Sequence, residues 1–108
     1  MIVITTQCFS PKIGGIESLM TGMADAMSEV GKDVLVLADG RNTTDDKNKK
    51  YKIKRFSGWK PYRRRRKAIY LKKFIENNNV EAIYADSWKS IEYLKDLNIK
   101  IIVLAHGT

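Results

Sequence analysis

Residues 34–38, Val-Leu-Val-Leu-Ala, form an unbroken apolar run that ends at Asp39 and Gly40. A strand that is apolar at every position has both faces buried, as in a parallel sheet covered by helices on each side. Residues 1–6 have the same character, and residues 82–85 repeat it later in the chain. The sequence therefore predicts an α/β fold built on a mostly parallel sheet.

Helices are expected between these strands. Apolar residues recur at helical spacing over residues 16–30, and Gly31 then supplies a C-terminal stop. A second helix is predicted to begin near residues 62–65, and a short third helix covers residues 87–97. Residues 51–56 alternate in polarity, which predicts a strand near a sheet edge. With a last strand before the C-terminus, the expected order is β-α-β-β-α-β-α-β, a Rossmann-like domain with helices on both faces.

The composition is that of one folded domain. The chain has 108 residues, of which 44% are hydrophobic, and this is enough for a single core. No apolar run is long enough to span a membrane, and the N-terminus lacks the pattern of a signal peptide. Cys8, the single cysteine, cannot form an internal disulfide, so we expect a reducing, cytoplasmic environment. Because residues 1–108 stop just after a predicted strand, we expect one partial domain of a longer protein.

The positive charge is concentrated in one segment. Residues 41–73 carry 15 lysines and arginines against two aspartates, a net charge of +13, whereas the rest of the chain carries −5. Such a patch indicates an anionic partner, namely a phospholipid surface, a phosphorylated substrate or nucleic acid. Trp59 and Tyr62 precede the second helix and suit interfacial anchoring, although a solvated basic face is the alternative. The residues predicted to bind the membrane or another anion are Arg63, Arg65, Arg66, Lys67, Tyr70 and Lys73.

Further candidates follow strands, at the carboxyl edge where open α/β sheets bind ligands. Gly14 and Gly15 precede the first helix, where backbone N–H groups can approach a phosphate closely; a plain β–α turn is the alternative. His106 follows the last strand, where an imidazole can donate a hydrogen bond or transfer a proton, unless it is an ordinary loop histidine. Asp86 ends the fourth strand and either contacts an acceptor or sugar, or caps the third helix.

The stretch Phe9-Ser10-Pro11-Lys12-Ile13-Gly14-Gly15-Ile16-Glu17 resembles the start of family-4 glycosyltransferases (glycosyl transferases group 1). The shared pattern is an aromatic residue, a small residue, Pro, two residues, Gly-Gly and an apolar–acidic pair. Strands that end at Asp86 and at His106-Gly107 match two later landmarks of that family in the same order. The resemblance implies a GT-B fold, in which two Rossmann-like domains face a cleft, and this chain matches an incomplete N-terminal, acceptor-side domain.

The resemblance also implies an activity. A retaining enzyme of this family transfers a sugar from a nucleotide-sugar donor to a glycan or lipid-linked acceptor, here at the cytoplasmic membrane face, and requires no metal or other cofactor. Gly14 and Gly15 would lie against the donor phosphates, and His106 near the transferred sugar. Because the C-terminal, donor-binding domain with its paired glutamates is not part of this sequence, we expect the fragment alone to be inactive. Its open sheet edge would favour self-association.

Other classes of protein fit the sequence less well. A basic α/β module that binds nucleic acid or other polyanions without catalysis is the main alternative. Its charge fits, but one basic run without an aromatic stacking platform on the sheet makes nucleic acid an unlikely partner. A response-regulator-like domain needs an acidic cluster after the first strand, and Thr5-Thr6-Gln7 supplies none. A scaffold without activity is the remaining interpretation.

Overall fold

The computed structural model describes residues 1–6, 15–40, 49–86 and 99–103. Five strands in this part of the chain form one sheet in the order β3-β2-β1-β4-β5, and every neighbouring pair is parallel. The strands are β1 (Ile2–Thr6), β2 (Val34–Asp39), β3 (Lys52–Phe56), β4 (Ala82–Ala85) and β5 (Ile101–Val103). The helices are α1 (Gly15–Glu29) and α3 (Lys60–Asn77). The predicted α/β fold with a parallel sheet is confirmed.

The strand β1 lies at the centre of the sheet, between β2 and β4. Its register places Ile4 beside Val36 on one side and beside Tyr84 on the other. All five residues of β1 are buried, Thr5 and Thr6 included, as in a strand that is covered on both faces. Because β2 and β3 lie on one side of β1 and β4 and β5 on the other, the strand order changes direction between β1 and β4.

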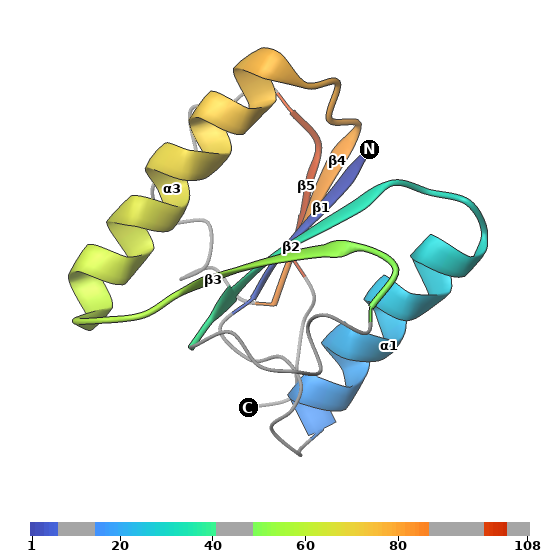
Figure 1. Cartoon of the computed structure of the whole chain (residues 1–108), viewed down its shortest axis with the longest axis horizontal. Coiled ribbons are helices and arrows are strands. Elements are labelled where there is room, and N and C mark those ends of the chain that lie inside the picture. Colours follow the sequence, from blue (N-terminus) through green and yellow to red (C-terminus); the bar gives the residue numbers. More distant parts are fainter. Residues whose placement is uncertain (7–14, 41–48, 87–98, 104–108) are drawn as a thin grey trace.

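One helix covers each face of the sheet (Figure 1). On one face α3 packs over a core that includes Val3 and Leu71, and on the other α1 packs over a core that includes Ile4 and Met20. Successive residues of β1 therefore point to opposite cores, as the period of a strand requires. The prediction of helices on both faces is confirmed.

The helix α1 ends where the sequence predicts. Gly31 follows it with a φ of 90°, a conformation that L side chains rarely adopt. Met20 and Ala24 are fully buried, as their spacing predicts. The helical spacing over residues 16–30 also predicts Leu19 and Val30 on this apolar face, but their side chains are 48% and 77% exposed. The buried stripe of α1 is thus narrower than the apolar pattern.

The helix α3 begins at Lys60, earlier than the predicted start at residues 62–65. Pro61 lies in its first turn, where a missing amide hydrogen is not needed for the helical bonds. The arginine run is therefore part of the helix. The edge position of β3 is confirmed, whereas residues 87–97, predicted as a third helix, lie outside the described residues.

Candidate ligand site at the carboxyl edge of the sheet

The pairing of β1 with β4 brings the carboxyl ends of these strands together. Thr6 ends β1, and its Oγ1 donates a 2.8 Å hydrogen bond to Oδ2 of Asp86, which directly follows β4. Both side chains are buried. This is the place where the strand order changes direction, and open α/β sheets bind ligands just outside such a point.

A buried lysine connects these ends to β2. Lys67 lies on α3, and its Nζ donates a 2.8 Å hydrogen bond to the backbone carbonyl oxygen of Thr6. The same ammonium forms an ion pair with the carboxylate of Asp39, the last residue of β2. Arg63, one helical turn earlier, places its Nε 3.0 Å from the other carboxylate oxygen of Asp39. Two cations from α3 thus hold one carboxylate, as a poorly hydrated charge requires.

Burial lowers the pKa of Lys67 below its ordinary value, because an ammonium is less stable away from water than in it. The carboxylates of Asp39 and Asp86 oppose this lowering, and the positive charge of Arg63 adds to it. We call Thr6, Asp39, Arg63, Lys67 and Asp86 the carboxyl-edge cluster. Its hydrogen bonds and ion pairs connect the carboxyl ends of β1, β2 and β4 to one another and to α3.

Two residues predicted on the exposed basic surface lie elsewhere. Lys67 is only 6% exposed, because it lies one turn before Leu71 on the side of α3 that faces the sheet. Tyr70 is half-buried, and its ring packs edge-on against Phe56, with centroids 5.8 Å apart, and stacks on Phe74 at 6.3 Å. Lys67 therefore belongs to the carboxyl-edge cluster and Tyr70 to the packing between α3 and β3.

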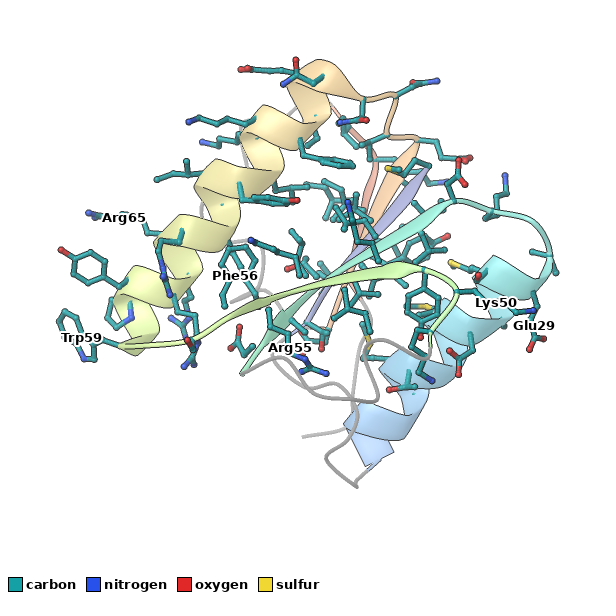
Figure 2. All side chains as sticks on the ribbon, viewed as in Figure 1. Glu29, Lys50, Arg55, Phe56, Trp59 and Arg65 are labelled. Carbon is teal, nitrogen blue, oxygen red and sulfur yellow. The ribbon has the colours of Figure 1, made fainter. Side chains whose placement is uncertain are left out.

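The remaining predicted basic residues divide between two environments. Arg63 is half-buried beside Asp39, whereas the side chains of Arg65, Arg66 and Lys73 are exposed. Ile69 lies among these exposed side chains and is itself 51% exposed. We call Arg65, Arg66, Ile69 and Lys73 the basic surface of α3. Figure 2 shows Arg65 pointing away from the sheet, toward the outside of the helix.

The residues predicted for donor and sugar contacts are only partly within the described chain. Gly15 is the first residue of α1, whereas Gly14 and His106 lie outside the described residues. Asp86 is described, and its carboxylate is 5% exposed and bonded to Thr6. Of these four candidates the structure therefore places Asp86, directly after β4, and Gly15, at the start of α1.

Sequence reasoning missed Thr6 and Asp39 as members of this cluster. A signal for Asp39 was present, because a carboxylate that ends a buried strand needs a cation nearby. A signal for Lys67 was present as well, because it precedes the inward-facing Leu71 by four residues and so shares its face. An ion pair of this kind is predicted when a lysine lies on the inward side of a helix and an aspartate ends a neighbouring strand.

Within the described ranges, no three His, Cys, Asp or Glu side chains are grouped as metal ligands. The helices described are also not long and apolar enough to cross a membrane. No family model matches the sequence, and no curated protein matches it.

Proposed function

We propose that the chain is the N-terminal, acceptor-side part of a retaining GT-B glycosyltransferase that uses a nucleotide-sugar donor and a glycan or lipid-linked acceptor. One observation carries the proposal: the pairing of β1 with β4 places Thr6 and Asp86 together at the carboxyl edge of a parallel sheet. The helix α1, whose first residue is Gly15, is the element that follows β1 in the chain. The resemblance of residues 9–17 to the family motif supplies the enzyme class, by analogy.

The proposal gives each candidate residue a role. Gly14 and Gly15 lie against the donor phosphates, because residues without side chains let backbone N–H groups approach an anion closely. His106 contacts the transferred sugar through its imidazole. Asp86 shapes the floor of the acceptor site through its bond with Thr6. The proposal includes no metal, and it assigns most donor contacts to a second domain.

The test is a transfer assay on the polypeptide that joins this chain to a donor-binding domain. A panel of nucleotide sugars is supplied with acceptor, and release of the nucleoside diphosphate is followed. Gly15→Val should lower the rate at least about tenfold, a barrier change near 1.4 kcal/mol, because its side chain would keep the donor phosphates away. Gly22→Ala is the matched control, since an added Cβ at this exposed position of α1 meets nothing within 4 Å. No release with any donor, or full activity of Gly15→Val, would contradict the proposal.

We further propose that the basic surface of α3 contacts an anionic membrane on the cytoplasmic side. The support is the combination of three exposed cationic side chains with the exposed Ile69 on one helix. Cationic side chains beside an anionic leaflet contribute about 1 kcal/mol each, and an apolar side chain among them adds burial in the headgroup region.

Co-sedimentation with vesicles tests this contact. The chain should bind phosphatidylcholine vesicles that contain phosphatidylglycerol and not vesicles of phosphatidylcholine alone. The double variant Arg66→Ser/Lys73→Ser should lose most of the binding, whereas Lys32→Ser/Lys100→Ser removes the same charge at the amino edge of the sheet and should retain it. Equal loss of vesicle binding in both double variants would mean that binding depends on net charge alone and not on the basic surface of α3. Binding of DNA with a steep salt dependence, without lipid binding, would favour the polyanion-binding alternative.

A further inference from the structure

A small pocket lies at the start of α3, outside the carboxyl-edge cluster. It has a volume of about 190 Å³, and its lining residues are Trp59, Pro61, Tyr62 and Arg65. Trp59 is 71% exposed and Tyr62 is 64% exposed. Large aromatic side chains contribute most when they are covered, so a pair of exposed rings that lines a hollow indicates a ligand. Figure 2 shows Trp59 and Arg65 on the outer side of α3, away from the sheet.

The backbone at this pocket is held by several hydrogen bonds. Gly58 has a φ of 107°, which turns the chain from β3 into the helix. Trp59 is the N-cap residue of α3, and its carbonyl oxygen accepts a 2.9 Å bond from the N–H of Arg63. The guanidinium of Arg63 also donates to the carbonyl of Gly58 at 3.1 Å, and that of Arg66 donates to the carbonyl of Ser57. The two rings are therefore presented from an ordered turn, which reduces the entropy lost when a ligand binds.

The shape of the pocket limits the size of its occupant. The ring centroids of Trp59 and Tyr62 are 6.2 Å apart, and the ring planes are inclined by 45°. A ligand ring inserted between two aromatic rings needs those rings to be roughly 7 Å apart, which is two van der Waals contact distances. Because Trp59 and Tyr62 are closer than this, a ligand ring must lie along their open side and not between them. The volume corresponds to about six water molecules, which suits one six-membered ring and is too small for a drug-sized ligand.

Arg65 supplies the polar partner at this pocket. Its side chain is exposed, and among the described residues it has neither a hydrogen bond nor an ion pair. A guanidinium binds a carboxylate or phosphate through two parallel hydrogen bonds. The net charge of +13 over residues 41–73 further favours an anion here.

We propose that this pocket is a subsite for one acidic sugar of the acceptor glycan. The apolar face of the pyranose ring stacks on Trp59 and Tyr62, and the carboxylate of the sugar pairs with Arg65. The inference rests on the proposed glycosyltransferase function and names the class of its acceptor as an acidic glycan.

Two other occupants fit this geometry less well. A bilayer is contacted best by rings that project from a convex surface, whereas these rings line a hollow with a cation beside it. A nucleic acid strand stacks its bases on successive aromatic platforms. In the described ranges, Trp59 and Tyr62 are the only aromatic side chains among the exposed large hydrophobic residues, so they provide one such platform.

The test is a titration of the chain with tetragalacturonate, an acidic oligosaccharide. The emission of Trp59 is followed in a Trp88→Phe background, which leaves Trp59 as the single tryptophan. We expect a saturable change, with binding at least about tenfold weaker for the neutral maltotetraose. Tyr62→Ala and Arg65→Gln should each weaken binding of tetragalacturonate by about tenfold. Lys52→Gln is the control, because it removes one exposed positive charge from residues 41–73 outside both the pocket and the basic surface of α3, and it should bind as wild type does.

Several outcomes would overturn the subsite. These are equal binding of the neutral and acidic oligosaccharides, no saturation with either, or loss of binding in Lys52→Gln as large as in Arg65→Gln. A change in Trp59 emission with anionic vesicles or with oligothymidylate, but not with tetragalacturonate, would assign the pocket to lipid or to nucleic acid. Saturable binding of tetragalacturonate together with a negative transfer assay would remove the glycosyltransferase proposal alone, whereas transfer without this binding would remove the subsite alone.

Discussion

The ammonium of Lys67 donates a 2.8 Å hydrogen bond to the backbone carbonyl oxygen of Thr6, 61 residues earlier in the chain. The same group forms an ion pair with Asp39 at the end of β2. The helix that carries the basic surface is therefore bonded directly to the carboxyl edge of the sheet, where the proposed function places its ligands. Each end of this connection can be tested by substitution.

Replacing Lys67 with Met should lower the free energy of unfolding by about 3 kcal/mol. The variant removes one of the two cations that hold the carboxylate of Asp39, and it takes the lysine donor from the carbonyl oxygen of Thr6; both losses are costly away from water. In an Asp39→Asn background the same replacement should cost much less, because no carboxylate is then left behind. Urea unfolding of the four proteins measures the coupling. Equal losses in both backgrounds would mean that the ion pair contributes nothing.

Lys67 should titrate below the ordinary lysine pKa of 10.5, because burial disfavours its charged form. A lowered pKa in the folded state means that the unfolded chain binds this proton more tightly. The free energy of unfolding of the wild type, relative to that of Lys67→Met, should therefore rise with pH from the folded-state pKa of Lys67 up to 10.5. Below this pH range the folded state carries the full cost of burying the charged ammonium. Nitrogen NMR of the Lys67 side chain measures the titration directly. A midpoint at or above 10.5 would contradict the prediction.

Thr6→Val should lower stability by about 1–3 kcal/mol. The substitution removes the hydroxyl that donates to Asp86 and leaves one buried carboxylate oxygen without this donor. Thr6→Ser keeps the hydroxyl and loses only a methyl group, so it is the matched control. Thermal unfolding at neutral pH should show the Val variant as the less stable of the two. The reverse order would show that the hydrogen bond to Asp86 is not what stabilises this strand end.

Gly58→Ala should destabilise the chain by about 1–2 kcal/mol, because φ at Gly58 is 107° and an L side chain is strained there. The same change at Gly22, inside α1 with open space around it, should stabilise the chain by about 0.5–1 kcal/mol. Urea unfolding of both variants gives the comparison. If Gly58→Ala is as stable as wild type, the turn into α3 does not need glycine.

The parts of the fold that the sequence predicts are those with a local signal. Residues 34–38 are apolar at every position and residues 2–6 are apolar or β-branched, so both are buried strands; α1 ends just before Gly31, because only glycine adopts φ of 90° easily. The alternation in residues 52–56 likewise marks an edge strand. The order of strands has no such signal, since an apolar run shows that a strand is buried and not which strand lies beside it. The position of β1 between β2 and β4 therefore comes from the tertiary structure.

The features of the candidate site likewise fall into those that the sequence predicts and those that depend on tertiary contacts. The pattern of residues predicts that a basic helix follows β3, and that Gly15 and Asp86 lie in segments that follow strands. Which basic side chains face outward depends on how α3 is rotated against the sheet, and this rotation has no signal in the sequence. That rotation buries Lys67 against Asp39 and leaves Arg65 exposed beside Trp59. Charge is a property of each residue, whereas burial is set by partners that are distant in the chain.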